Sequence, residues 1–268
     1  MQLDAYFERI GYRGAARADL DTLRDIVLRH ATSIPFENLD PFLGRPVSLA
    51  PEDLERKLVR EGRGGYCFEH NLLLMRVLRT LGFEASGLAA RVLWMRDEAE
   101  LTLRSHMLLR VVVDGADWLA DVGFGGMTPT GVLALQEGIE QATPHEPFRL
   151  RRRDGDWWLQ GQVRGQWRTL YRFDLQPQHP LDYEMPNHYV STHPASHFVH
   201  GLSAALPRED GRLALRDREL SFHPREGETR KRLLGDAAEL RAVLEGEFGL
   251  RLPDTPQLEG RLQGVFAR

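Results

Sequence analysis

The spacing of the apolar residues changes near residue 82, and this change limits what the chain can fold into. Before it, apolar residues recur every three or four positions, as at Leu20, Leu23 and Val27, which is the period of a helix with one buried face. After it, short strand-forming segments follow one another, separated by Asp-Gly pairs at 114–115 and 154–155. The pattern predicts an α+β fold and excludes a purely helical or purely β one.

Helices are expected mainly in the first third of the chain. The segment MQLDAYFERIGYRG predicts an amphipathic first helix, and a later helix is expected from Tyr66 to Leu81 with Gly82 as its C-terminal cap. Beyond Pro177 we expect loops, a hairpin across GRLALRDRELSFH, and a last helix with Asp236 as its N-cap. An antiparallel sheet that closes into a small barrel is predicted by the segments FEASGLAARVLWM, HMLLRVVV, DWLADV, FRLRRR, DWWLQGQV and QWRTLYRFDL.

The charge and the cysteine content argue against several classes of protein. The formal net charge is -4, so the chain lacks the basic surface of a protein that neutralises nucleic-acid phosphates. Its start is too polar for a signal peptide, and no apolar run reaches the roughly 20 residues that span a bilayer. A single cysteine forms no disulfide within the chain. We therefore expect a cytoplasmic protein that binds neither nucleic acid nor a membrane.

The single cysteine, Cys67, lies in the segment RGGYCFEHN, in the first turn of the helix expected from Tyr66. Free backbone N–H groups and the positive end of the helix dipole favour a thiolate at such a position. The preceding Gly64 and Gly65 let backbone, and therefore a substrate, come close. Position alone supports two interpretations equally: a nucleophile, or a small residue packed in the core.

A nucleophilic cysteine needs a base and a group that orients the base, and His106 and Asp121 are the best candidates. If the hairpin turns at 114–115, Asp121 faces Leu108 and is a diagonal neighbour of His106 on the same face of the sheet. One loop residue more or fewer would put them on opposite faces. Singly, each is better explained by a local role in a strand. Together with Cys67 they predict a Cys-His-Asp arrangement like that of cysteine proteinases.

Five motifs, in this order, resemble those of the arylamine N-acetyltransferases. They are YFERIGYRG (6–14), IPFENLD (34–40), RGGYCFE (63–69), SHMLL (105–109) and ADVGFGG (120–126). The likeness is strong from residue 4 to residue 130 and weak beyond it.

The resemblance implies a fold and a reaction. The fold is a helical bundle over residues 1–82 that carries the nucleophile, a β-barrel over 83–190 that carries His and Asp, and an α/β lid over 191–268. Cys67, His106 and Asp121 fall on the family's catalytic triad. The implied reaction moves an acetyl group from acetyl-CoA, a cosubstrate, to an aromatic amine or hydrazine through an acetyl-cysteine. No bound prosthetic group is expected.

The resemblance also implies residues that bind the substrates. Phe36 and Phe124 match positions that line the acceptor pocket, although core packing is the better explanation of a Phe taken by itself. Gly123, Gly125 and Gly126 match the loop near the coenzyme A entrance, although tight turns often use such glycines.

The sequence also offers a candidate metal site and other functions for the same triad. Four histidines lie close together, but their spacing matches no zinc pattern, and we expect no metal: His188, His193, His197 and His200. The same triad would serve an amide synthase that transfers a polyketide-type acyl chain to an amine. It would also serve a cysteine hydrolase or transglutaminase-like enzyme, whereas an inert thiol would leave a non-catalytic binding module.

Overall fold

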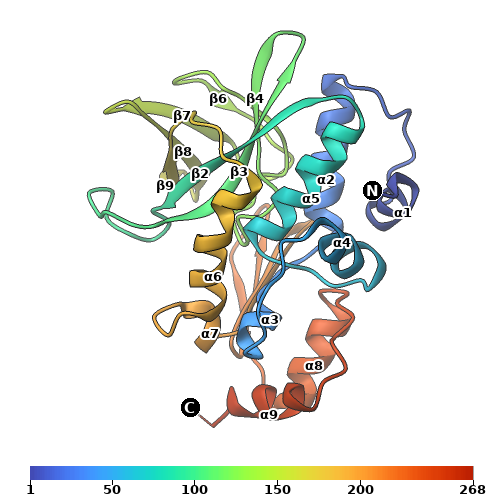
Figure 1. Ribbon diagram of the computed structural model, residues 1–268. Coiled ribbons are helices and arrows are strands. Elements are labelled where there is room, and N and C mark those ends of the chain that lie inside the picture. Colours follow the sequence, from blue (N-terminus) through green and yellow to red (C-terminus); the bar gives the residue numbers. More distant parts are fainter. Residues whose placement is uncertain (268) are drawn as a thin grey trace.

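The computed structural model describes residues 1–267, and its helices and strands fall into three groups (Figure 1). N-terminal helices lie beside an antiparallel sheet of eight strands, and a second sheet of five strands lies next to the C-terminal helices. This confirms the expected combination of helical bundle, antiparallel barrel and α/β lid. The division of the chain at residues 82 and 190 stays a prediction.

The N-terminal helices begin and end at the signals that the sequence carries. The Asp19 side chain accepts the Thr22 N–H at 2.8 Å and caps one helix, and Gly82, with φ +91°, follows another as predicted. The Gly82 position is left-handed, which glycine adopts without strain. The elements are α1 (Leu3–Ile10), α2 (Leu20–Ser33), α3 (Leu39–Phe42), α4 (Pro51–Leu54), the π-helix η1 (Glu55–Arg60) and α5 (Cys67–Thr80).

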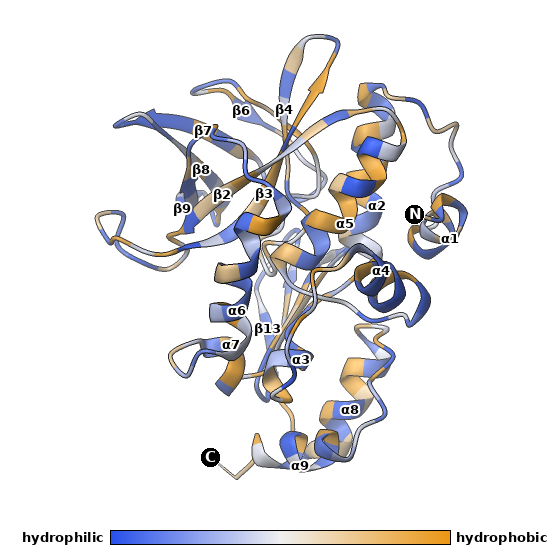
Figure 2. Cartoon of the chain, in the orientation of Figure 1, coloured by the Kyte–Doolittle hydropathy of each residue, from blue (hydrophilic) through white to orange (hydrophobic). Residues whose placement is uncertain are grey.

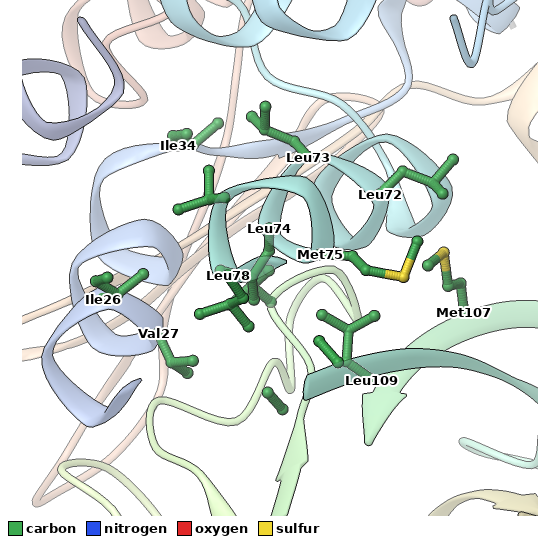
Figure 3. Packing of buried hydrophobic residues seen from close by; sticks show 14 of the residues in the cluster. Ile26, Val27, Ile34, Leu72, Leu73, Leu74, Met75, Leu78, Met107 and Leu109 are labelled. Carbon is green, nitrogen blue, oxygen red and sulfur yellow. The ribbon is translucent and has the colours of Figure 1, made fainter. Parts of the chain in front are cut away.

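Helix α5 is buried between α2 and the strand β3 (Arg104–Val113) (Figure 3). Its Leu74 and Leu78 lie toward α2, and its Met75 lies near Met107 and Leu109 of the strand. Each fully buried side chain of this kind contributes roughly 1.5–3 kcal/mol. Figure 2 shows the same concentration of hydrophobic residues on α2, α5 and β3. The packing holds the start of α5 against the sheet.

The eight-stranded sheet closes through a side chain. Its edge strands are β5 and β6, and the amide of Gln141 in β6 bonds both the N–H and the carbonyl of Ala134 in β5, at 2.7 and 2.9 Å. The order is β5-β4-β3-β2-β9-β8-β7-β6. The other strands are β2 (Glu84–Val92), β4 (Ala116–Ala120), β5 (Leu133–Ala134), β6 (Glu140–Gln141), β7 (Phe148–Arg153), β8 (Asp156–Val163) and β9 (Gln166–Phe173).

The five-stranded sheet joins the two ends of the chain. Strand β1 (Phe36–Glu37), from the N-terminal region, pairs with β10 (Ser203–Arg208) at the sheet's edge. The predicted hairpin is present as β11 (Gly211–Arg216) and β12 (Glu219–Pro224), followed by β13 (Arg230–Leu233). Asp236 caps α8 (Ala237–Gly246) as predicted, and its side chain accepts the Glu239 N–H at 2.8 Å. The fold ends with α9 (Pro256–Gly264).

The expectation of loops beyond Pro177 was wrong. The segment holds a 3-10 turn, η2 (Pro180–Tyr183), and two helices, α6 (Glu184–Thr192) and α7 (His197–His200). Pro186 is the third residue of α6, where a missing N–H costs no hydrogen bond. Distant contacts then hold the helix, because Asn187 accepts the Tyr66 hydroxyl and donates to the Val47 carbonyl at 2.9 Å. Among residues 1–267, no helix combines the length and the apolar composition that crossing a bilayer requires.

Candidate active site

Cys67 is the first residue of α5, as its sequence position predicted. The two glycines before it are packed against protein. A Cβ on Gly64 would lie 2.0 Å from the Pro35 carbonyl oxygen, and one on Gly65 would lie 2.6 Å from a carboxylate oxygen of Glu69. The close approach that these glycines allow is therefore between protein segments, and the expectation that they admit a substrate was wrong.

Buried charges support the backbone just before Cys67, which the sequence analysis did not anticipate. The ammonium of Lys57 bridges Asp40 at 2.7 Å and Glu69 at 2.6 Å, and Arg63 pairs with Glu37 at 2.8 Å. Because burial and the neighbouring carboxylates outweigh Lys57, the pKa of Glu69 is raised to about 7. Removing one partner from such a buried set costs several kcal/mol, so the network fixes the start of α5.

His106 and Asp121 meet as the hairpin register predicted. The turn is centred on 114–115, both with positive φ, and Leu109 pairs with Ala120. Asp121 follows β4 directly, and its Oδ2 lies 2.7 Å from Nε2 of His106 in β3. Both side chains are buried.

The sulfur of Cys67 lies beside the same imidazole. Its sulfur lies 3.6 Å from the Ser105 carbonyl oxygen, and it is close enough to His106 to raise the pKa of the ring. Since Nε2 of the ring faces Asp121, its Nδ1 is the atom left for the sulfur. Cys67 is 5% exposed, so protein encloses nearly all of the residue. The imidazole of His106 therefore lies next to both the Asp121 carboxylate and the Cys67 sulfur.

Opposing effects set the protonation of His106 and Asp121. Burial lowers the pKa of His106, but the charge and hydrogen bond of Asp121, together with Cys67, raise it to about 10. Burial alone would raise the pKa of Asp121, but His106, the Gly123 N–H and Asn71 hold it below its ordinary value. An ionised carboxylate beside a protonated ring is therefore the stable pair at neutral pH.

Asn71 belongs to this site although the sequence analysis missed it. It lies one helical turn after Cys67, and its amide nitrogen donates to the Met107 carbonyl at 2.8 Å and to Oδ1 of Asp121 at 3.1 Å. Its oxygen accepts the Val122 N–H at 3.2 Å. The spacing of four residues from the cysteine on one helix face was a signal that could have found it.

Tyr171 in β9 was also missed. Its hydroxyl donates to Oδ2 of Asp121 at 2.9 Å, and its ring centroid lies 4.9 Å from that of His106. The ring of Phe124 contacts His106 edge-on at 5.1 Å. No local pattern marked Tyr171, because its role depends on the pairing of β2 with β9.

The predicted binding residues lie around the same place. A Cβ on Gly123 would lie 2.6 Å from the Cα of Cys67, and Gly125, with φ +80°, backs onto the ring of Phe36. Gly126 is exposed, and its carbonyl accepts Nη1 of Arg212 at 3.4 Å. Phe36 is half-buried beside Phe198, a residue that the sequence analysis missed, with ring centroids 6.0 Å apart. Their part in binding stays a prediction.

The four clustered histidines make local contacts. His193 stacks on Tyr189 with centroids 4.3 Å apart, and His200 bonds the Pro194 carbonyl at 2.5 Å. Within residues 1–267, no group of three His, Cys, Asp or Glu side chains is arranged to hold a metal ion.

Comparisons with known proteins agree with the fold. A family model described as N-acetyltransferase matches residues 19–257. An arylamine N-acetyltransferase of Mycolicibacterium smegmatis is 49% identical over 258 residues, which cover 95% of this chain and 94% of that protein. The solved structure of the Mycobacterium tuberculosis arylamine N-acetyltransferase has 46% identity and a TM-score of 0.94, covering 98% of this chain and 100% of that one. The Mycobacterium marinum arylamine N-acetyltransferase, solved in complex with CoA, has 43% identity and a TM-score of 0.95. The match covers 98% of this chain and 99% of that one.

The fold and the family match together define a class, the N-acetyltransferases. Within that class, the chain belongs to the arylamine N-acetyltransferase family. The motifs had indicated a likeness that weakens beyond residue 130, but the relatives match through the C-terminal part as well.

Proposed function

We propose that this protein transfers the acetyl group of acetyl-CoA to an aromatic amine or hydrazine through an acetyl-cysteine on Cys67. The observation that carries the proposal is the hydrogen bond between His106 and Asp121, with Cys67 beside the same imidazole, within the fold of this family. The names of the relatives support the acceptor class, and the CoA complex of the M. marinum relative supports the donor. The single cysteine supports a reducing, cytoplasmic location.

In the first half-reaction the thiolate of Cys67 attacks the thioester carbon of acetyl-CoA. A carbon–sulfur bond forms to Cys67, the bond to the CoA sulfur breaks, and CoA takes a proton from His106 as it leaves. The ring holds that proton at neutral pH because Asp121 and the sulfur, opposing burial, raise the pKa of His106 to about 10. Asp121 orients the ring and stabilises its charge.

In the second half-reaction an amine attacks the acetyl group. Acetylation removes the negative charge of the sulfur, which is one of the groups that raise the pKa of His106. The pKa of the ring therefore falls in the acetyl-enzyme, and the neutral ring accepts the proton of the amine. The nitrogen–carbon bond forms, the bond to Cys67 breaks, and the thiolate and protonated ring are restored. An aromatic amine suits this step, since it is neutral near pH 7.

The substrates would be bound by the residues around the sulfur. Phe36 and Phe124 are proposed to line the acceptor site, which is supported by the contact of Phe124 with His106. Gly123, Gly125 and Gly126 are proposed to border the entrance of CoA, which is supported by the packing of Gly123 on Cys67.

Intact-protein mass spectrometry tests the proposal directly. Incubation with acetyl-CoA is expected to add one acetyl group, roughly 42 Da, and release one equivalent of CoA. The gain is expected to disappear in Cys67→Ala, and aniline added to the isolated acetyl-enzyme is expected to reverse it with formation of acetanilide. In His106→Gln the gain is expected to form at least about a hundredfold more slowly.

Three outcomes would favour other functions. Acylation by longer acyl-CoA donors but not by acetyl-CoA would favour an amide synthase. Turnover of peptide amides without any acyl-CoA would favour a cysteine hydrolase. If iodoacetamide failed to alkylate Cys67 below pH 8 and no acyl donor reacted, the thiol would be inert.

A further inference from the structure

A continuous series of buried side chains that the proposed reaction does not use lies behind α5. The hydroxyl of Tyr6 lies 2.8 Å from Nδ1 of His30, and Nε2 of His30 lies 2.9 Å from Nδ1 of His70. Nε2 of His70 lies 3.2 Å from the carbonyl oxygen of Pro35. All three side chains are fully buried, so no water competes for these bonds. The series connects α1, α2 and α5 with the residue that precedes Phe36.

The direction of every bond in this series is fixed by its last member. The Pro35 carbonyl can only accept, so Nε2 of His70 carries a hydrogen and donates. In a neutral ring, Nδ1 of His70 then accepts from Nε2 of His30, and Nδ1 of His30 accepts from Tyr6. Burial supports the neutral forms, because it lowers the pKa of His70 to about 4 and that of His30 well below its ordinary value.

The Pro35 carbonyl is a point where three segments meet. Besides His70, it accepts the Gly65 N–H at 3.4 Å, and the missing side chain of Gly64 gives it room. Phe36 is the next residue and forms a parallel bridge with Gly65. Because a peptide unit is planar, fixing the Pro35 carbonyl also fixes the backbone direction at Phe36. The bond from His70 therefore helps to hold the backbone from which the Phe36 ring extends.

His70 also lies on the same first turn as the sulfur, three residues after Cys67. A rigid path thus runs from Cys67 along the helix to His70, through one hydrogen bond to Pro35, and on to Phe36. The loop at 123–125 contacts both ends of this path, with Gly123 against Cys67 and Gly125 against the Phe36 ring. The bond from His70 to Pro35 thus acts on the distance between the Cys67 sulfur and the Phe36 ring, together with the bridge of Phe36 to Gly65 and the pairing of β1 with β10.

We propose that His70, held by His30 and Tyr6, is a positioning residue that sets the Phe36 ring relative to the Cys67 sulfur and so selects aromatic acceptors in the second half-reaction. This rests on the proposed function. Misplacement of a reacting group by about 1 Å can cost a hundredfold in rate. Loss of the bond to Pro35 should therefore slow transfer to a planar aromatic amine. It should not slow transfer to hydrazine, which is too small to depend on contact with the Phe36 ring.

A matched pair of amide variants isolates that bond. In His70→Gln the amide nitrogen takes the place of Nε2 and reaches Pro35, whereas the shorter side chain of His70→Asn keeps a partner for His30 only. With isolated acetyl-enzyme, we expect His70→Gln to stay within about twofold of wild type with aniline and hydrazine. We expect His70→Asn to lose at least about tenfold with aniline alone. Tyr6→Phe removes the hydroxyl at the far end of the series. It should also lose rate with aniline and not with hydrazine, but by a smaller factor.

The outcomes separate this inference from the proposed function. If the wild type forms no acetyl-enzyme, the proposed function fails. The positioning role can then still be tested by comparing the rates at which iodoacetamide, a small reagent, and N-phenyl iodoacetamide, an aromatic one, alkylate Cys67. Equal loss with both acceptors in folded His70→Asn, or full aniline activity in that variant, would overturn the positioning role. If His70→Asn does not fold, an unchanged acceptor ratio in Tyr6→Phe would overturn it.

Discussion

Asn71 and Asp121 stand 50 residues apart in the chain, and the amide of the first donates to Oδ1 of the second at 3.1 Å. The Gly123 N–H donates to the same oxygen at 3.0 Å. The other oxygen, Oδ2, accepts from His106 at 2.7 Å and from Tyr171 at 2.9 Å. Every partner of the carboxylate is a donor, so Asp121 has one orientation and one charge state in which all four bonds are made.

Replacing Asp121 by Asn should therefore disrupt the site although the shape is kept. Its NH₂ group would face donors, and the ring of His106 would lose the acceptor that fixes its orientation. We expect acetyl-enzyme to form at least about a hundredfold more slowly, measured as CoA release in a rapid-mixing experiment. Asp117→Asn is the control, since Asp117 lies on the same hairpin in a partly exposed pair with Arg110. Equal rates in Asp121→Asn and wild type would remove Asp121 from the mechanism.

Asn71→Ala tests the second support of that carboxylate. The variant leaves the Met107 carbonyl and the Val122 N–H without partners in a buried place, which costs about 1–3 kcal/mol in the free energy of unfolding. We also expect the rate of acetyl-enzyme formation to fall about tenfold, because Asp121 loses one of its four donors. Urea unfolding and CoA release measure the two effects. A loss of stability with an unchanged rate would make Asn71 purely structural.

The parts of the site that follow from the sequence are those set by local rules. The Asp-Gly turn fixed the register of one hairpin, and the register placed His106 and Asp121 on one face. The helical period placed Cys67 at the start of α5. Tyr171 could not be predicted in this way, because its contact requires β9 to pair with β2 across 70 or more intervening residues, as between Arg91 and Arg172.

The fold, like the site, has some parts that local sequence predicts and others that only long-range contacts determine. Turns and caps such as Asp236 are local, and they lie where the sequence indicates. The pairing of β1 with β10 joins Phe36 to Ala205, and closure of the barrel depends on Gln141. Helix α6 depends on contacts of Asn187 with distant backbone. Such long-range contacts override local preference, and no short window of sequence contains both partners.

The buried histidines predict a dependence of stability on pH. The pKa of His70 is lowered to about 4 in the folded chain, against 6.5 for an exposed histidine, so between these values the unfolded chain binds more protons. The free energy of unfolding should fall as the pH falls through this window, by about 3 kcal/mol from His70. The charged groups near the His70 ring are Glu37 and Lys57, and the one near the His30 ring is Arg9. Urea unfolding between pH 7 and pH 4 measures this fall in the free energy of unfolding.

His70→Gln is the matched variant for that measurement. Glutamine does not titrate, so the free energy of unfolding of His70→Gln should change less steeply with pH than that of wild type, by the contribution of His70. Carboxylates such as Glu69 affect both proteins equally. His30 remains in the variant, and its lowered pKa leaves part of the slope. Parallel slopes in the two proteins would mean that His70 is not held neutral.

The packing of Gly123 against Cys67 leads to a last prediction. A Cβ at Gly123 would lie 2.6 Å from the Cα of Cys67, which is a backbone atom of a buried helix and cannot swing aside. Gly123→Ala should therefore cost about 1–3 kcal/mol in the free energy of unfolding. It should also slow acetyl-enzyme formation at least about tenfold, since either α5 or the loop after β4 must move. Gly260→Ala in α9 is the control, because a Cβ there meets no atom within 4 Å and alanine favours a helix. Wild-type stability and rate in Gly123→Ala would mean that the loop is not held against the cysteine.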